Sequence, residues 1–187
     1  PAGAPRTSLV GGAVRDAILG VPHGPDLDLV VEGDAISLAR DIGRALGGRV
    51  VAHERFGTAR IEFAHGRHVD MVTARRETYA APGALPDVTP GDIDDDLARR
   101  DFTVNAMAFG LAGDEGGDPV MNGAFVDPHG GREDLDARVL RAVGNAAERF
   151  KEDALRTLRA ARFASRFQLT IEPVTAAAIR DAAGLTS

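Results

Sequence analysis

Two aspartates separated by one residue stand where the sequence turns apolar. Asp26 and Asp28 flank Leu27 in HGPDLDLVVEG, and residues 29–31 are aliphatic. Residues i and i+2 of a strand share a face, so the two Cα atoms lie about 6.6 Å apart and Leu27 is expected to face the core. Like charges this close repel unless a cation neutralises them, and carboxylates are good Mg²⁺ ligands. The pair indicates a metal site, although aspartate in GPD is also typical of a turn.

A third carboxylate is available on a neighbouring predicted strand. In HVDMVTA, Val69 and Met71 are expected to face the core and Asp70 the opposite side. Glu62 in RIEFA is the competing candidate. Three carboxylates on adjacent strands permit a two-metal site of the kind used for phosphoryl and nucleotidyl transfer.

A double glycine precedes the aspartates in LVGGAVRD. Gly11 and Gly12 let backbone N–H groups approach a ligand, and the following helix N-terminus favours phosphate. Arg15 lies in the first helical turn, where it can clamp an anion. A double glycine alone is more often a simple turn, but its position before the Asp-x-Asp pair favours a nucleotide site.

The segment EDALRTLRAARFASRF places four arginines on one side of a predicted helix. Within an arc of about 120° lie Arg156, Arg159, Arg162 and Arg166. The side expected to pack consists of Ala154, Leu158, Ala161 and Ala164. Like charges at this spacing repel, and a bound triphosphate would reverse the sign of that effect. The alternative is a solvated face, partly neutralised by Glu148, Glu152 and Asp153.

The helices and strands that must position these residues follow from the hydrophobic pattern and from the residues that end or cap each element. Strands are expected at 7–10, 26–31, 49–54, 58–64 and 68–74, with a tight hairpin before the last. Helices are expected at 13–19, ended by Gly20, and at 35–46, between an Asp34 N-cap and Gly47. Segment 75–91 is predicted to be a long loop, 92–110 to hold one or two helices, and 111–123 to be a solvent loop or acidic hairpin. From about residue 133 the chain is expected to be mostly helical.

Composition limits the function classes. The chain has 187 residues, is 44% hydrophobic and lacks cysteine, which excludes disulfides and thiolate metal sites and is consistent with the cytoplasm. Its apolar runs are too short to span a membrane. The net charge of −6 argues against a broad polyanion-binding surface, so a nucleic-acid partner would need a local patch. Because the sequence starts at Pro1, we expect it to be part of a longer protein.

Five motifs in order resemble the class II tRNA nucleotidyltransferases. They are GGAVRD, DLD, RRDFTVNA (99–106), VDPHGGREDL (126–135) and RFKEDALRTLRAARFA (149–164). That family comprises CCA-adding, CC-adding and A-adding enzymes and the bacterial poly(A) polymerases. The resemblance implies an α+β fold: a polymerase-beta-type nucleotidyltransferase head over 1–140, with a mixed or antiparallel sheet flanked by helices. Residues 141–187 would begin an all-helical neck.

The resemblance also implies an activity and its residues. The activity is template-independent addition of CMP and/or AMP, from CTP and ATP, to the 3′ end of tRNA. Two Mg²⁺ ions would be bound by Asp26, Asp28 and Asp70. The nucleotide would be contacted by Gly11, Gly12, Arg15, Arg100, Asp101, Asn105, Asp153, Arg156, Arg159 and Arg162. Among these, Asp153 and Arg156 would read the edge of the base.

Three alternatives stay open at this point. A poly(A) polymerase of the same family would make a long homopolymer instead of a defined end. A non-catalytic nucleotide- or RNA-binding module would keep the arginines and lose a carboxylate. A metal-dependent nuclease would not need the arginine helix. The presence of three carboxylates and the arginines disfavours the last two.

Overall fold

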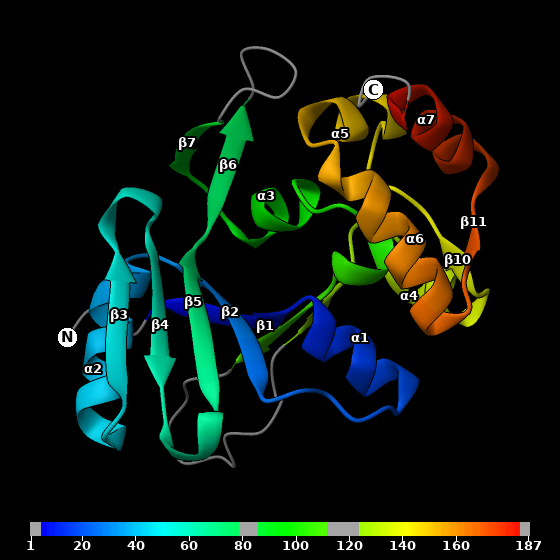
Figure 1. Cartoon of the computed structure of the whole chain (residues 1–187). Coiled ribbons are helices and arrows are strands. Elements are labelled where there is room, and N and C mark those ends of the chain that lie inside the picture. Colours follow the sequence, from blue (N-terminus) through cyan, green and yellow to red (C-terminus); the bar gives the residue numbers. More distant parts are fainter. Residues whose placement is uncertain (1–4, 79–85, 112–123, 184–187) are drawn as a thin grey trace.

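The computed structural model describes residues 5–78, 86–111 and 124–183. Its centre is a seven-stranded mixed sheet in the order β3-β4-β5-β2-β1-β8-β9, in which only the β2–β5 pair is parallel (Figure 1). The strands of this sheet are β1 (Arg6–Val10), β2 (Asp26–Glu32), β3 (Arg49–His53), β4 (Thr58–Glu62), β5 (His68–Thr73), β8 (Ala108–Leu111) and β9 (Phe125–Val126). The predicted α+β class with a mixed sheet is confirmed.

The helices lie on both sides of this sheet. They are α1 (Gly12–Leu19), α2 (Ala35–Leu46), α3 (Ile93–Ala98), α4 (Gly131–Asp136), α5 (Ala146–Glu152), α6 (Leu155–Phe167) and α7 (Pro173–Ala183). Asp34 caps α2 by accepting from the amides of Ile36 and Ser37, and Gly47 ends it in the left-handed conformation, as predicted. No helix in the described ranges is long and apolar enough to cross a bilayer.

Side chains alternate between the two faces of the sheet along each strand, and the apolar ones decide which face each helix covers. Val31, Ile61 and Met71 point to one face and pack against α2. On the other face, Val10 and Val30 pack against Leu97 of α3. Asp28 shares the face of Val30, so it lies on the α3 side, where a space between the sheet and α6 stays open.

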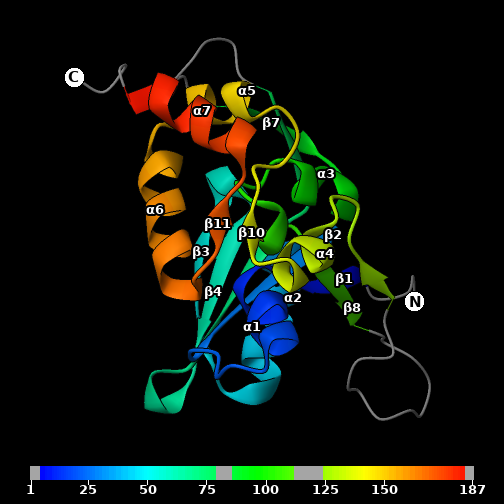
Figure 2. The same ribbon diagram turned by 90° about the vertical axis from the view of Figure 1, so that its right-hand side faces the viewer.

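The C-terminal helices share a core with the elements before them. Phe102, which follows α3, packs against Phe150 of α5 and Phe163 of α6. The short parallel strands β10 (Val139–Leu140) and β11 (Thr170–Ile171) lie between α4 and α6 (Figure 2). One continuous hydrophobic cluster therefore extends across the predicted boundary at residue 140, and the division into head and neck stays a prediction.

Two sequence-based expectations were wrong. Leu27 faces the same side as Leu29, but it is 40% exposed, because the α2 core does not extend to the start of β2. Segment 75–91 is not a simple loop, since β6 (Arg75–Thr78) and β7 (Asp87–Pro90) pair antiparallel. Charged side chains on β6, rather than apolar alternation, pair with Asp95 of α3 and with Arg99 directly after it, so periodicity could not reveal this strand. The hairpin or loop expected at 111–123 falls almost wholly outside the described residues.

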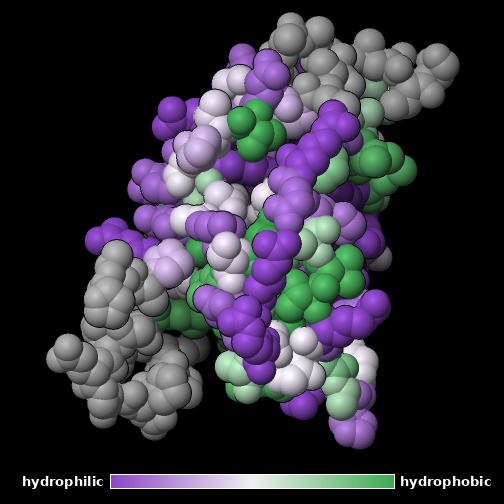
Figure 3. Space-filling model, turned by 90° about the vertical axis from the view of Figure 1, so that its left-hand side faces the viewer, coloured by the Kyte–Doolittle hydropathy of each residue, from purple (hydrophilic) through white to green (hydrophobic). Residues whose placement is uncertain are grey.

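Strand β3 forms one edge of the sheet. Arg49 and His53 are exposed at its two ends. On this side of the molecule a band of hydrophilic residues runs beside a hydrophobic patch (Figure 3). The charged Arg49 at one end of β3 discourages this edge strand from pairing with another chain.

Candidate active site

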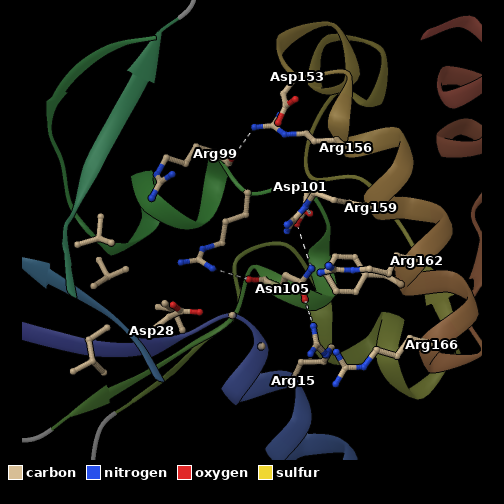
Figure 4. Close-up of a pocket in the computed structure, with 18 residues that line it drawn as sticks. Arg15, Asp28, Arg99, Asp101, Asn105, Asp153, Arg156, Arg159, Arg162 and Arg166 are labelled. Atoms are coloured by element: carbon tan, nitrogen blue, oxygen red, sulfur yellow. Dashed lines mark hydrogen bonds and ion pairs between the residues drawn. The ribbon is translucent and has the colours of Figure 1, made fainter. Parts of the chain in front are cut away.

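A pocket lies between the α3 side of the sheet and α6. Its cavity volume is about 540 Å³, within the usual range for small-molecule sites. The charged and polar groups in its wall come from the β1–α1 turn, β2, the segment after α3, and α6 (Figure 4). Together with the Phe163 ring, the wall includes Gly11, Gly12, Arg15, Asp28, Arg99, Arg100, Asp101, Asn105, Asp153, Arg156, Arg159, Arg162 and Arg166. Every residue predicted to contact the nucleotide is therefore in one wall, although the contacts themselves stay a prediction.

The pocket is strongly cationic in an acidic chain. Seven arginines and three aspartates line it, whereas the whole chain carries a net charge of −6. Arg162 and Arg166 make no hydrogen bond or ion pair within the described part of the chain. Their guanidinium groups lie 5.1 Å and 5.0 Å from the rings of Phe163 and Phe167. Unpaired guanidinium groups concentrated in a concave site favour a polyanionic ligand.

The packing face predicted for α6 was wrong. The four arginines do line the pocket, but Leu158 is 70% exposed, while Ala160, Phe163 and Phe167 are buried. Phe163 lies inside the arginine arc, where its ring packs on Phe102 in an edge-to-face arrangement. The large aromatic side chains therefore determine how the helix docks, and the guanidinium groups extend around them into the pocket.

Arg15 is held by the protein on all sides. Its Nε and Nη2 donate to Asp16 at 2.9 Å and 2.6 Å, and its Nη1 donates to Asn105 Oδ1 at 2.6 Å. The guanidinium carbon lies 4.1 Å from the Phe167 ring centre. Burial lowers the pKa of Arg15, and the bond to Asp16 opposes that shift. Arg15 thus connects α1 to α6 in the pocket wall. In its predicted role of binding an anion, it would use only the N–H groups of Nη1 and Nη2 that do not bond to Asp16 or Asn105.

A second chain of contacts joins α6 to the segment after α3. Arg159 Nε donates to Asp101 Oδ2 at 2.6 Å. Asp101 Oδ1 accepts from the amide of Phe102 at 2.9 Å and from Asn105 Nδ2 at 3.2 Å. Because Asn105 also accepts from Arg15, these contacts link α6 back to α1. Asp101 and Asn105 therefore set the relative positions of two pocket arginines.

The three carboxylates lie on neighbouring strands. Asp28 pairs in register with Asp70 on β5, and Asp26 pairs with His68. Desolvation by the surrounding protein raises the pKa of Asp28, with Asp70 and Asp26 adding to the shift, although its side chain is open to the pocket. Glu62 lies one strand further away, on β4, and pairs with Arg49 at 2.6 Å. The register therefore favours Asp70 over Glu62 as the third carboxylate.

The carboxylates are not gathered around a single point. Both oxygens of Asp70 accept from Arg60, at 2.7 Å and 2.8 Å, and His68 Nε2 lies 3.2 Å from Asp26 Oδ1. Of the three, only Asp28 lines the pocket. Among the residues described, no group of three acidic or histidine side chains is already arranged to hold a metal. A cation at Asp28 and Asp70 would have to displace Arg60.

The glycine turn has two physical requirements at Gly11. Its φ of +69° is in the left-handed region, and a Cβ atom there would lie 2.8 Å from Arg100 Nη1. Arg100 thus packs directly against the turn, and any side chain at Gly11 would displace it.

We predict that Gly11→Ala both destabilises the protein and weakens ligand binding in the pocket. Backbone strain should cost about 1–2 kcal/mol of unfolding free energy, and Arg100 must also move. Gly20→Ala is the matched control, since Gly20 has a φ of +64° with nothing within 4 Å of the added Cβ. Urea unfolding and nucleotide titration of both variants test this. Equal loss of nucleotide affinity in the two variants would contradict it.

Comparisons with known proteins agree with this geometry. Residues 7–141 match the Poly A polymerase head domain family. The chain belongs to that family. The matched residues of the poly A polymerase head include the glycine turn, the three carboxylates and the segment after α3. The arginine helix α6 follows the matched region.

Individual relatives of this head domain are similar over most of the chain. An A-adding tRNA nucleotidyltransferase of Halalkalibacterium halodurans is 47% identical over 168 residues, which cover 90% of this chain and 37% of that protein. A CC-adding tRNA nucleotidyltransferase of Deinococcus radiodurans is 42% identical over 179 residues, covering 95% and 45%. The chain thus spans less than half the length of either relative.

Solved structures show that the fold extends through the helical region. A tRNA nucleotidyltransferase complexed with a primer tRNA and an incoming ATP analog superposes with a TM-score of 0.80 at 36% identity, covering 97% of this chain and 47% of that one. A CCA-adding enzyme in its apo form II gives a TM-score of 0.82 at 39% identity, covering 95% and 40%. The expected nucleotidyltransferase head fold is therefore confirmed.

Several residues of this poly A polymerase head site were not predicted. Arg99 and Phe163 line the pocket, and Arg166, noted only as part of the arginine arc, does as well. Asp16 and Asp96 lie behind the lining and are 1% and 0% exposed. A sequence signal existed for Asp96, because it stands three and four residues before two arginines. The burial of Asp96 and of its ion pairs with these two arginines could not be read from that spacing.

Proposed function

We propose that this chain is the catalytic part of a template-independent RNA nucleotidyltransferase. It adds CMP and/or AMP, from CTP and ATP, to the 3′ end of tRNA in the cytoplasm. The observation that carries the proposal is a pocket lined by seven arginines whose edge holds Asp28, in register with Asp70. The pocket suits a nucleoside triphosphate, and the carboxylates suit the reaction at its α-phosphate.

The polyphosphate is bound by the cationic wall. Arg162 and Arg166 have guanidinium groups with no acidic partner among the described residues. Arg100 lies against Gly11, beside the N-terminus of α1, where backbone N–H groups also favour phosphate. These groups neutralise the polyphosphate and hold its α-phosphate near Asp28.

The base is read by Asp153 and Arg156 at the start of α6. Asp153 Oδ1 accepts from the amide of Leu155, which leaves Oδ2 to accept from an exocyclic amino group. Arg156 is fixed by Glu152 at 2.7 Å and by the carbonyl oxygens of Arg149 and Arg99. Cytosine and adenine carry an amino group at the position of the base edge where uracil and guanine carry a carbonyl oxygen, so an acceptor placed there supports selection of C and A.

Magnesium fits the donor chemistry of the carboxylates. Asp26, Asp28 and Asp70 offer hard oxygen ligands on adjacent strands, and the raised pKa of Asp28 indicates a carboxylate that gains from a nearby cation. Asp70 becomes available as a metal ligand once its ion pair with Arg60 is broken. Bound Mg²⁺ ions would supply activation of the RNA 3′-hydroxyl and charge stabilisation at the phosphates.

The proposal is tested by incorporation assays with defined primers. The complete protein is incubated with tRNAs ending at the discriminator base, at C or at CC, with each labelled nucleotide separately. We expect a product extended by one to three residues from CTP, ATP or both. A long adenosine homopolymer would indicate a poly(A) polymerase instead. Nucleotide binding without any incorporation would contradict the catalytic proposal and favour a binding module.

A further inference from the structure

Asp96 is a buried carboxylate shared by two pocket arginines. It lies in α3, is 0% exposed and does not itself line the pocket. Its Oδ1 accepts from Nε and Nη2 of Arg99, the first at 2.9 Å. Its Oδ2 accepts from Nε and Nη2 of Arg100, at 3.2 Å and 2.9 Å. Asp96 therefore holds each guanidinium group along the edge formed by Nε and Nη2, and both arginines line the pocket.

The two arginines differ in their other partners. Arg99 Nη1 also contacts Glu77 of β6 at 3.3 Å. Within the described residues Arg100 has no other ion pair than that with Asp96, and its Nη1 donates to the carbonyl oxygen of Asn105 at 3.3 Å. The orientation of Arg100 thus depends on Asp96 more than that of Arg99 does.

A second carboxylate competes for Arg100. Asp28 and Arg100 line the same pocket, yet no hydrogen bond or ion pair joins them. Arg100 instead packs against Gly11, where only the missing Cβ leaves room for Nη1. A guanidinium released from Asp96 would turn to Asp28, the nearby carboxylate that has no pairing arginine.

We propose that Asp96 is the positioning residue of the nucleotide site: it holds Arg100, and with it Arg99, facing the polyphosphate and away from Asp28. This inference rests on the proposed function, because it assumes that the pocket takes a nucleoside triphosphate. In the protein Asp96 touches neither nucleotide nor RNA and acts only through the two arginines.

The test compares Asp96→Asn with a matched buried aspartate. Asp134 is 6% exposed, accepts from Arg141 and Thr103, and lies outside the pocket wall. We expect Asp96→Asn to weaken CTP and ATP binding about tenfold or more, from the loss of charge-assisted hydrogen bonds. Asp134→Asn should lower the unfolding temperature and leave nucleotide affinity unchanged.

Two further readouts separate positioning from a structural role. The preference for CTP over CMP should fall in Asp96→Asn and stay constant in Asp134→Asn, because Arg100 faces the phosphates. In the Arg100→Gln background, Asp96→Asn should reduce CTP affinity by a clearly smaller factor than in the wild type, because only its effect through Arg99 remains. Additive losses in that double variant would overturn the proposal.

A conservative variant keeps the test decisive if Asp96→Asn does not fold. Asp96→Glu retains the charge but shifts both hydrogen-bonded edges by one methylene, so CTP affinity should fall in a folded protein. Wild-type affinity in Asp96→Glu would overturn the positioning role alone. Absence of CTP and ATP binding in the unmodified chain would overturn both this inference and the proposed function.

Discussion

Replacing Asp28 with alanine should abolish nucleotide incorporation while leaving the fold intact. Asp28 is the carboxylate that both lines the pocket and pairs in register with Asp70, so it is the group best placed to bring a metal to the α-phosphate. Loss of several kcal/mol of charge stabilisation corresponds to a rate reduction of about 10³-fold or more. The side chain is exposed to the pocket, so truncation leaves no cavity in the core.

Incorporation of labelled CTP and ATP into tRNA measures this effect, with circular dichroism and melting to confirm folding. Glu62→Ala is the control, because Glu62 is the competing carboxylate but pairs with Arg49 on the far side of β5. We expect near wild-type incorporation for Glu62→Ala. Turnover retained in Asp28→Ala would remove the proposed mechanism.

Replacing Phe102 with alanine should cause a large loss of stability. Phe102 is 0% exposed, and its ring centre lies 6.4 Å from that of Phe150 and 5.9 Å from that of Phe163. Deleting a buried phenylalanine costs about 3–5 kcal/mol of unfolding free energy. Because Asp101 precedes it and accepts from its amide, the pocket should loosen as well.

Urea unfolding of Phe102→Ala measures that cost. Phe56→Ala serves as the control, since Phe56 is 54% exposed and its removal should change stability by less than about 0.5 kcal/mol. A loss below about 1 kcal/mol in Phe102→Ala would show that the helices after residue 140 do not depend on this packing.

Much of the site was predictable because the spacing of residues along one strand or helix decides which side chains share a face. The two aspartates share a strand face, Gly11 forms the turn before α1 and Gly12 begins that helix, and the four arginines of α6 line one pocket. Each of these facts depends on periods of two or 3.6 residues and on glycine's freedom at positive φ. The α2 helix, from its Asp34 cap to Gly47, follows from the same local rules.

Other features depended on contacts between distant segments. The packing side of α6 was set by Phe163 and Phe167 meeting Phe102, which periodicity could not distinguish from a side with Leu158. Strand β6 pairs with β7, and its charged side chains form ion pairs with Asp95 of α3 and with Arg99. The register that places Asp70 beside Asp28, and leaves Glu62 a strand away, was visible only once β5 was seen between β2 and β4.

The sequence by itself determined which residue types were available and which of them share a strand face or a helix face. Tertiary structure alone decided the long-range partners, which are Arg60 for Asp70, Asp101 for Arg159 and Asn105 for Arg15, and it decided the burial of Asp16 and Asp96. The reason is physical. Side-chain direction follows from local backbone geometry, whereas burial and ion pairing depend on which segments the fold brings together.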